Sequence, residues 1–450
     1  MLKRILKKII ISILTFEAKL ILKKYQPKII AITGSVGKTS TKDAVAAVLK
    51  SKFSVRESQK SYNSEIGVPL TIIGAETGWH KPSKWLAAIF KGMVLLLKKK
   101  KYPDILVLEM GADRPGDIER FAGWIKPRVV VMTALGEIPV HVEFFSGLEA
   151  VAKEKSKIIR PLGNDDWAIF NNDDKSVSEM RDKTKAGVLA FGMGEGADIL
   201  GSNYHIIYRK DKKTGLEIPE GITFKADFKG SSVPVRLANT FGRHHVYAAL
   251  AALAVGVSQN LNLVEISESL SLYSAPPGRL KLIEGIKNSW ILDDTYNASP
   301  IAAQAALDVL AEMTASPRLN SLSADKAGGA GRKIAVLGDM LELGRYAIEA
   351  HRQVGRKVSG IADLVFLVGP RSKFIAEVCR EKGMAPEKIY EFSDAREAGK
   401  KLQNIIEDGD LILIKGSQSM RMERAVEEIM AHPEEKEKLL VRQEKEWQKK

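Results

Sequence analysis

The sequence is poor in cysteine and has few aromatic residues. Its 450 residues include a single cysteine, Cys379, and aromatic side chains make up 7% of the chain. One thiol can form neither an internal disulfide framework nor a thiolate metal site, and it suits a reducing cytoplasm. The aromatic residues are not interleaved with basic ones as a base-stacking surface requires, so we expect no nucleic-acid partner.

The first 24 residues lack an apolar run long enough to cross a bilayer. The run IIISILTF covers residues 9–16, and Glu17 and Lys19 interrupt it. No small-residue cleavage site follows, so a signal peptide is also excluded. Wound as a helix, the segment would be amphipathic. Such a helix can lie in a membrane interface, or it can pack on the protein's own first domain with its lysines solvated, and the sequence leaves both interpretations open.

Positive charge is in excess and is unevenly placed. The chain has 69 Lys and Arg against 55 Asp and Glu, which gives a formal net charge of +14. Residues 1–24 hold seven basic residues and one acid, and a second basic run covers residues 98–101 after the apolar stretch MVLLL. Such patches favour anionic partners, which include membranes and phosphorylated substrates.

The chain is too long for one hydrophobic core, and its pattern predicts α/β domains. Short apolar runs alternate with helical segments, which predicts parallel sheets with helices on both faces. Residues 196–236 contain short alternating runs instead, which predict a small antiparallel β insertion. The predicted strands cover residues 27–33, 104–111, 128–135, 289–294, 333–339, 364–369 and 410–416, and two predicted helices cover 38–50 and 245–257.

The segment TGSVGKTS, residues 33–40, has the composition of a phosphate-binding loop. It follows a predicted strand and precedes a predicted helix, and Ile32 stands where the common P-loop has its first glycine, so this is a shortened variant. Its glycines let backbone N–H groups turn toward a phosphate, and the helix N-terminus adds positive potential. We expect it to bind ATP and Mg²⁺ through Gly34, Ser35, Val36, Gly37, Lys38, Thr39 and Ser40.

Seven later segments, taken with this loop, resemble the Mur ligases, the amide-forming enzymes of peptidoglycan synthesis. The resemblance runs from about residue 28 to residue 430 and is closest to the branch that adds D-alanyl-D-alanine. The segments are SYNSEIGVPLTI (61–72), LEMGADRPGDI (108–118), AVAKEKSKI (150–158), GRLKL (278–282), DDTYNASP (293–300), VLGDMLELG (336–344) and KGSQSMRME (415–423).

The resemblance implies a fold and a division of the chain into four parts. The fold would be α/β, with a central P-loop parallel-sheet ATPase domain, a small β insertion and a C-terminal Rossmann-like α/β domain. The four parts would be a basic amphipathic helix (1–27), the ATP-binding domain (28–275), the C-terminal domain (276–432) and a charged tail (433–450). The Ser-, Gly- and Ala-rich residues 315–331 are expected to form a mobile loop.

Site roles follow from the same resemblance. Glu109 ends a predicted strand and His141 follows another, at the edge where ligands bind in open α/β sheets, and the family holds Mg²⁺ there. Lys155 matches a lysine that the family carbamylates to hold a second Mg²⁺, although by itself it would be a solvated residue of a helix. Arg279 resembles an arginine that meets the γ-phosphate. The expected metal ligands are Thr39, Glu109, His141 and Lys155, and the expected catalytic residues are Lys38, Lys155, Arg279 and His141.

Further residues are expected to bind nucleotide or substrate. The nucleotide residues would be His245, Asp294, Tyr296 and Asn297, and the substrate residues Asn63, Asp339, Glu342, Lys415 and Ser417. Two departures stand out. His245 and Ala248 replace family asparagines, one of which touches adenine. The family's domain that grips the UDP moiety of the donor is also not found ahead of the loop at residue 33. Either other surfaces of the protein would bind UDP, or the donor would be carried by a lipid.

We expect an ATP-dependent ligase that activates a muramoyl-peptide carboxylate as an acyl phosphate and then adds D-alanyl-D-alanine. The donor would be UDP- or lipid-linked, and the enzyme a cytoplasmic monomer, with peripheral contact to an anionic membrane as a further expectation. One alternative is a related ligase that adds another amino acid, such as glutamate. The other is a non-catalytic, membrane-associated module that keeps only nucleotide binding.

Overall fold

The computed structural model describes residues 2–59, 62–78, 81–112, 114–136, 145, 147–210, 217–315, 331–444 and 447. The chain forms two compact units. The N-terminal unit comprises Met1–Asn203, Phe224–Arg236 and His244–Tyr273, and the C-terminal unit comprises Tyr204–Thr223, Leu237–Arg243 and Ser274–Lys450. The expected mobile loop falls largely on residues 316–330, which lie outside the described residues, as does His141.

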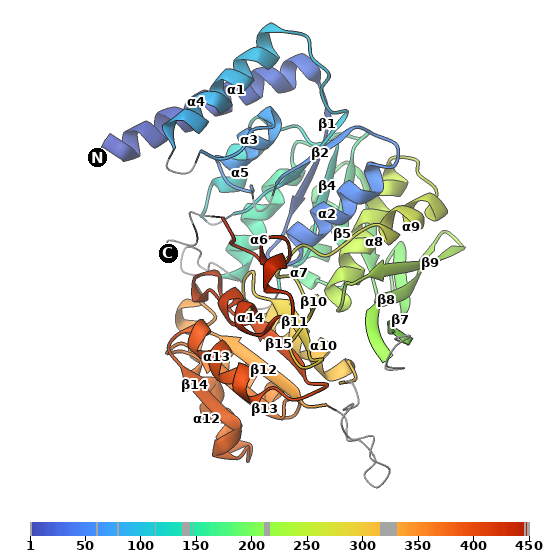
Figure 1. The fold of residues 1–450 in the computed structure, drawn as a ribbon. Helices are drawn as coiled ribbons and strands as arrows, with labels where there is room; N and C mark the ends of the chain where they lie inside the picture. The colour runs from blue at the N-terminus through green and yellow to red at the C-terminus, as the bar shows by residue number, and fades with distance from the viewer. Residues whose placement is uncertain are drawn as a thin grey trace. The chain divides into compact units, whose positions relative to one another are not determined.

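A nine-stranded sheet forms the first layer of the structure (Figure 1). Neighbouring strands from β2 through to β7 pair in parallel. Strands β3 and β4 are buried along their whole length, as expected for parallel strands covered by helices on both faces. The spatial order is β2 (Val55–Glu57), β3 (Ile105–Glu109), β1 (Lys28–Thr33), β4 (Val129–Met132), β5 (Trp167–Asn171), β6 (Gly187–Gly192), β7 (Ile199–Lys210), β8 (Glu217–Phe228) and β9 (Ser231–Ala238).

Helices cover both faces of the parallel part of this sheet. On one face, Ile29 and Ala31 of β1 pack in a core with α1, α3, α4, α5 and α6, while the alternate residues Ile30 and Ile32 point away from that core. Helix α2 packs against α9 on the other side. The helices are α1 (Leu2–Tyr25), α2 (Lys38–Leu49), α3 (Gly67–Ile73), α4 (Pro82–Leu97), α5 (Asp117–Ala122), α6 (Leu148–Ser156), α7 (Lys175–Ser178), α8 (Arg243–Ser258) and α9 (Leu263–Ser271).

The β insertion expected at residues 196–236 corresponds to the long strands β7, β8 and β9. Lys229 and Gly230 join β8 to β9 with φ angles of 47° and 78°. Two consecutive residues with positive φ are the geometry of a tight antiparallel hairpin. The alternating burial of β9 matches its alternating sequence, because one face of this strand is covered and the other is exposed.

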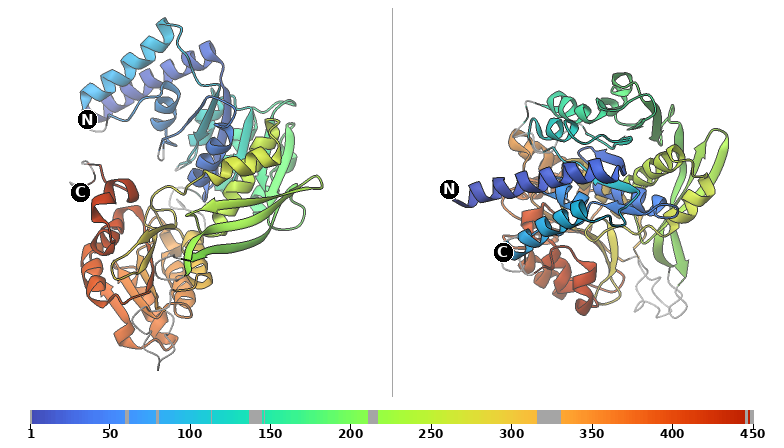
Figure 2. Two further views of the ribbon diagram at one scale, coloured as in Figure 1. Left: turned by 45° about the vertical axis from the view of Figure 1, so that its right-hand side comes forward. Right: turned by 90° about the horizontal axis from the view of Figure 1, so that it is seen from above.

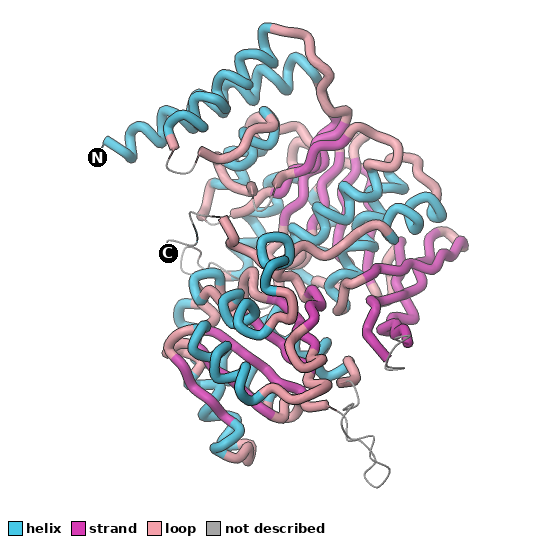
Figure 3. Tube along the Cα trace, viewed as in Figure 1, coloured by secondary structure: helices cyan, strands magenta, loops and turns pink. Residues whose placement is uncertain are grey.

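The C-terminal unit contains a six-stranded sheet (Figure 3). Strand β10 pairs antiparallel with β11, and the other neighbouring strands pair in parallel. The order is β10 (Lys281–Glu284), β11 (Trp290–Asp294), β15 (Leu411–Lys415), β12 (Lys333–Gly338), β13 (Leu364–Val368) and β14 (Ile389–Phe392). Its helices are α10 (Pro300–Glu312), α11 (Ala347–Val358), α12 (Lys373–Glu381), α13 (Ala395–Ile405), α14 (Glu423–Ile429) and α15 (Lys436–Leu439). The α/β class predicted from the sequence is therefore confirmed.

The basic N-terminal helix α1 packs against α4 and α3. Its inner side buries Leu14, Ala18 and Ile21. At its end, Lys24 Nζ donates to the carbonyl oxygens of Leu95 and Leu96, at 2.8 Å each, and to that of Lys98 at 3.0 Å, which satisfies the last turn of α4. One side of α1 therefore packs on the N-terminal unit, as one of the two interpretations of this helix expected. Among the described helices, none is both long enough and apolar enough to cross a membrane.

Glu17 is a buried acid between α1 and α4. Its side chain is 4% exposed, and its Oε2 atom has no hydrogen-bond partner among the described residues. A Cβ at Gly92 of α4 would collide with this carboxyl group, so the carboxyl group packs directly against the backbone of α4 at this glycine. Burial raises the pKa of Glu17 to about 7.

We predict that Glu17→Gln removes a pH dependence of folding stability. A carboxyl pKa that is higher in the folded chain stabilises the fold fully below about pH 4.5, and this contribution is lost as the pH rises through 7. The variant should therefore be more stable than the wild type by about 1–3 kcal/mol at pH 8 and by much less at pH 4. Urea unfolding at both pH values measures this, and an unchanged difference between them would contradict the assignment.

Candidate active site

The loop after β1 is held against the end of β4. Gly34 and Gly37 have φ angles of 146° and 83°, in the region that favours glycine. A Cβ at Gly34 would overlap the hydroxyl oxygen of Thr133. The N–H groups of Ser35 and Val36 donate to the carbonyl oxygen of Ala134, at 2.6 and 3.1 Å. The loop therefore takes its shape from a direct contact with the neighbouring strand.

This contact narrows which loop amides can bind a phosphate. Because the amides of Ser35 and Val36 donate within the protein, the amides that remain for a phosphate are those of Gly37, the N-cap residue, and of the first turn of α2, which begins at Lys38. The first N–H groups of a helix have no intrahelical acceptor, and they combine with the helix dipole to attract anions. The geometry thus fits a phosphate at the N-terminus of α2.

A hydroxyl and a carboxylate lie together beside this helix terminus. Thr39 Oγ1 donates to Glu109 Oε2 at 3.0 Å, and Asn63 Nδ2 donates to Glu109 Oε1 at 3.1 Å. Glu109 ends β3 and is 1% exposed. Asn63 thus orients this carboxylate, and its expected contact with substrate stays a prediction. Ser58, which the sequence did not single out, accepts the N–H of Glu109 at 3.2 Å.

These oxygen atoms fit a magnesium ion. Mg²⁺ prefers oxygen ligands and keeps several waters when proteins bind it through one or two carboxylates. Among the described residues there is no group of three or more His, Cys, Asp or Glu side chains that could hold a metal. Thr39 and Glu109 would therefore hold the ion together with water or phosphate oxygens. His141, the expected imidazole ligand, lies outside the described residues, so its role stays a prediction.

Two lysines lie against the carbonyl groups of the loop. Lys155 Nζ donates to the carbonyl oxygen of Gly34 at 3.1 Å, and Lys38 Nζ donates to that of Ser35 at 3.2 Å. Lys155 lies on α6 and is 3% exposed. It is therefore not the solvated helix residue that its lysine-rich surroundings would suggest, and it lies at the loop where the resemblance places it.

His245 has a different environment from the one expected of a nucleotide contact. Its side chain is fully buried in α8, and its Nδ1 atom lies 3.1 Å from the hydroxyl oxygen of Tyr273. Its ring centroid is 4.1 Å from that of His244. These contacts make His245 part of the core of the N-terminal unit, so its contact with adenine stays a prediction without support from this geometry.

In the C-terminal unit, two expected site residues pair with each other. Lys415 Nζ donates to Asp294 Oδ2 at 2.6 Å and to the carbonyl oxygen of Asn297 at 3.0 Å. Burial raises the pKa of Asp294 and lowers the pKa of Lys415. The charge of Lys415 partly offsets the rise for Asp294, and the charge of Asp294 partly offsets the fall for Lys415. Asn297 Oδ1 accepts the N–H of Gln418 at 3.2 Å. Lys415, expected to meet substrate, thus joins the ends of β11 and β15.

Arg279 lies over an aromatic ring at the same edge. Its guanidinium carbon is 4.1 Å from the ring centroid of Tyr296, a cation–π contact that fixes the plane of the guanidinium group. Asp293 links the residues before Arg279 to the end of β11, because it accepts the N–H of Gly278 at 3.0 Å and the hydroxyl of Thr295 at 2.6 Å. Burial raises the pKa of Asp293 to about 6. The paired acids at a strand end were a signal for this role that the sequence analysis did not use.

Two of the remaining expected substrate residues are buried, and one is exposed. Asp339 Oδ1 accepts the N–H groups of Arg371 and Ser372, at 2.9 and 2.8 Å. Ser417 Oγ accepts the N–H of Leu341 at 2.8 Å. Both side chains are at most 4% exposed and shape the loops after β12, β13 and β15. Glu342 is exposed, with a φ angle of 61°.

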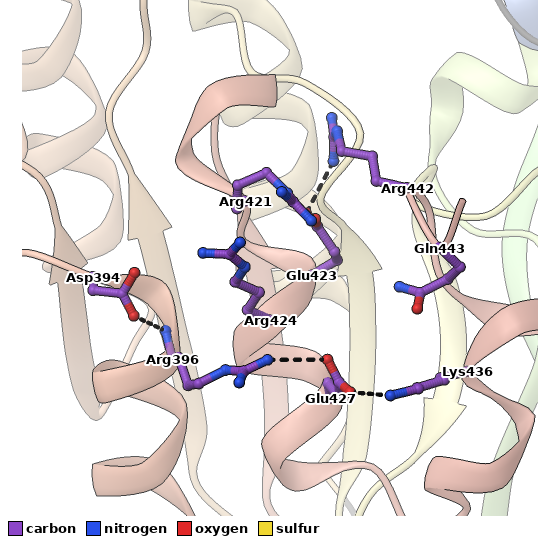
Figure 4. A pocket seen from close by; sticks show the side chains of 9 residues that line it. All are labelled: Asp394, Arg396, Arg421, Glu423, Arg424, Glu427, Lys436, Arg442 and Gln443. Carbon is purple, nitrogen blue, oxygen red and sulfur yellow. Dashed lines mark hydrogen bonds and ion pairs between the residues drawn. The ribbon is translucent and has the colours of Figure 1, made fainter. Parts of the chain in front are cut away.

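A cavity of about 500 Å³ lies in the C-terminal unit (Figure 4), and Arg442 in its lining donates to the carbonyl oxygen of Tyr296, one of the expected nucleotide residues. Arg442, in the charged tail, is 7% exposed and donates to Glu423 Oε2 at 3.0 Å and to the carbonyl oxygen of Thr295 at 3.1 Å. The tail is therefore anchored here. The lining residues are Asp394, Arg396, Arg421, Glu423, Arg424, Glu427, Lys436, Arg442 and Gln443.

The loop, the helix terminus and the hydroxyl–carboxylate pair together have the geometry that suits a nucleotide-dependent enzyme. Residues 32–82 and 88–256 match the model of the Mur ligase middle domain, and residues 278–418 match the model described as Mur ligase, glutamate ligase domain. The chain belongs to the Mur ligase family, whose members are ATP-dependent ligases that form amide bonds.

Individual relatives agree with this family. The chain is 31% identical to the UDP-N-acetylmuramoyl-tripeptide–D-alanyl-D-alanine ligase of Escherichia coli, over 89% of this chain and 76% of that protein. A crystal structure of MurF from Acinetobacter baumannii is 25% identical, with a TM-score of 0.72 over 93% of this chain and 79% of that one. A structure of MurF ligase from Thermotoga maritima in complex with ADP is 25% identical, with a TM-score of 0.70 over 93% and 83%.

We predict that Gly34→Ala weakens nucleotide binding. The added methyl group would displace Thr133, and the backbone conformation would be strained by on the order of 1–3 kcal/mol, so the affinity should fall about tenfold or more. Titration with a fluorescent ADP analogue measures this. Gly230→Ala is the matched control, because Gly230 also has a positive φ but has no atom within 4 Å of its added Cβ. Equal affinities for the two variants would contradict the role of the contact.

We also predict that Arg442→Met destabilises the C-terminal unit. The substitution leaves Glu423 buried without one of its charged partners, which should lower the free energy of unfolding by about 3 kcal/mol. Urea unfolding followed by circular dichroism measures the loss. Arg424→Met is the control in the same cavity wall, and it should cost less than about 1 kcal/mol. A similar small cost for both would show that Arg442 does not anchor the tail.

Proposed function

We propose that the chain is an ATP-dependent ligase that joins D-alanyl-D-alanine to the peptide carboxylate of a muramoyl-peptide donor, in peptidoglycan precursor synthesis. One observation carries the proposal. The Thr39–Glu109 pair lies at an intact phosphate loop in a chain 31% identical to the E. coli ligase named above. An amide ligase that activates its donor with ATP needs this combination of phosphate donors and oxygen ligands in one place.

The reaction would proceed in two transfers. In the first, a donor carboxylate oxygen attacks the γ-phosphorus of ATP, the bond to the β–γ bridging oxygen breaks, and an acyl phosphate and ADP form. In the second, the neutral amine of D-alanyl-D-alanine attacks the acyl carbon and expels phosphate, and the nitrogen loses a proton. The first turn of α2 and Lys38 would orient the phosphates during the first transfer.

Magnesium, Lys38 and Arg279 would offset negative charge on the transferring group. Thr39 and Glu109 are the proposed ligands in the described structure, with His141 and a carbamylated Lys155 as further proposed ligands. Magnesium, when bound, supplies a positive charge close to the γ-phosphoryl group. The buried position of Lys155 at the Gly34 carbonyl supports its assignment to this site. We assign Arg279 to the γ-phosphate, because a planar fork of donors suits a phosphoryl group.

We further propose that the enzyme works as a monomer in the cytoplasm, in peripheral contact with the inner face of an anionic membrane, with a UDP- or lipid-linked donor. The basic residues of α1 and those that follow α4 support the membrane contact. A membrane-bound enzyme would meet a lipid-linked donor at the surface that carries it, which favours that form of the donor.

A second candidate is a Mur-type ligase that adds a single amino acid such as glutamate. One observation favours it: residues 278–418 match a family model described as Mur ligase, glutamate ligase domain.

The proposal predicts ADP release that depends on both a muramoyl tripeptide and D-alanyl-D-alanine. UDP-linked and lipid-linked donors are each assayed with D-alanyl-D-alanine, D-alanine or glutamate, with Mg²⁺ present. Lys38→Met should lower kcat by about 10²-fold or more, because an amine that orients phosphates is removed. Lys388→Met, at an exposed lysine of the C-terminal unit, should leave kcat unchanged. Preference for a single amino acid would favour the second candidate, and amine-independent release would contradict both.

A further inference from the structure

The outer side of the α1/α4 pair is an exposed apolar surface. The two helices lie side by side in each view (Figure 2). Of thirteen large hydrophobic side chains that are exposed in the described structure, ten lie on these two helices. They are Ile5, Leu6, Ile9, Ile13, Phe16 and Leu20 on α1, and Leu86, Phe90, Met93 and Leu97 on α4. A protein of this size scatters such residues singly, so this concentration requires an explanation.

The exposed residues form two matching rows. On α1, positions 9, 13, 16 and 20 are exposed, and on α4, positions 86, 90, 93 and 97 repeat the same spacing of four, three and four. That spacing keeps side chains on one face of a helix. Each helix therefore has two apolar faces, one that packs into the core of the N-terminal unit and one that does not.

Both rows lie on the same side of the pair. The carboxyl ends of the helices meet, because Lys24 binds carbonyl groups in the last turn of α4, so the helices run in the same direction. Glu17 and Gly92 mark the line where they touch. Successive residues of a helix are rotated by about 100° around its axis. When the rotation is counted from Glu17 on α1 and from Gly92 on α4, the two exposed rows point to the same side of the pair, away from the core. The half-buried Trp85, Ile89 and Leu96 of α4 lie beside the line and continue the apolar surface.

Lysines dominate the charge around this surface, where one exposed acid, Glu76, lies 3.8 Å from Lys84. Residues 5–25 and 81–101 contain twelve lysines and a single acid, Glu17, which is buried. The four lysines of residues 98–101 are all exposed directly after α4. A second copy of this chain would bring like charges together, which disfavours self-association through this face. An apolar face bordered by lysines instead complements an anionic lipid surface, whose acyl chains accept the apolar rows and whose headgroups attract the lysines.

We propose that the exposed α1/α4 face docks in the interface of an anionic lipid bilayer, with Phe16, Phe90 and Leu97 inserted among the lipids. This inference deepens the proposed membrane location and does not depend on the ligase reaction. The phosphate loop lies at the carboxyl end of β1, whereas α1 leads into the amino end of that strand. Docking therefore leaves the nucleotide site accessible, so lipid binding and nucleotide binding are measured separately.

The test uses the full chain and sedimentation with vesicles. Vesicles of phosphatidylcholine with about a quarter phosphatidylglycerol should bind the wild type at least about tenfold more tightly than pure phosphatidylcholine vesicles, and high salt should weaken this binding. The triple variant Phe16→Gln, Phe90→Gln and Leu97→Gln should lose about tenfold or more of this affinity, because its apolar anchors are removed. Binding of a fluorescent ADP analogue should be unchanged, which reports that the variant is folded.

A matched control exists in the same chain. Val264, Leu272 and Ile348 are exposed apolar residues elsewhere in the structure, and their replacement by Gln should leave vesicle binding at the wild-type level. Equal losses in both triple variants, or equal binding to neutral and anionic vesicles, would overturn the proposal. A third result would also overturn the proposal: anionic vesicles bind no protein, and the wild type is a dimer that the first triple variant converts to a monomer. The face would then join two copies of the chain.

Discussion

The nucleotide site depends on the close contact between Gly34 and the end of β4. Thr133 donates its hydroxyl to the carbonyl oxygens of Val36 and Thr33, at 2.7 and 3.2 Å, and Ala134 accepts the next two loop amides. These bonds fix where the loop ends and where α2 begins. The position of Thr39, and hence its bond to Glu109, follows from the start of that helix. A side chain at Gly34 would separate the loop from the strand, so the whole arrangement requires glycine at this position.

Much of the fold followed from local patterns in the sequence. The predicted strand at residues 27–33 is β1, and the predicted helix at residues 38–50 is α2, with ends that differ by one residue. Buried parallel strands read as continuous apolar runs, so period and length suffice to find them. The phosphate loop was equally clear, because its glycines, lysine and threonine lie within eight consecutive residues.

Contacts between distant residues could not be read in the same way. Lys415 and Asp294 lie 121 residues apart, and their pairing depends on the adjacency of β11 and β15 in the sheet. Motif resemblance marked both residues but could not separate a structural pair from substrate contacts. Arg442 gave no signal at all, because a tail rich in both charges looks the same whether it is anchored or solvated. The N-terminal helix gave two alternatives, and the structure supports packing for one face of α1 while the other face stays exposed.

The central claim is that a donor carboxylate is activated by transfer of the γ-phosphoryl group. The most direct measurement follows oxygen from a muramoyl tripeptide whose terminal carboxylate carries ¹⁸O. The account predicts that phosphate released during turnover with D-alanyl-D-alanine contains one ¹⁸O atom, because the acyl carbon–oxygen bond breaks when the amine attacks. Label found in AMP, or phosphate without label, would contradict it, since either result means that the carboxylate was not activated as an acyl phosphate.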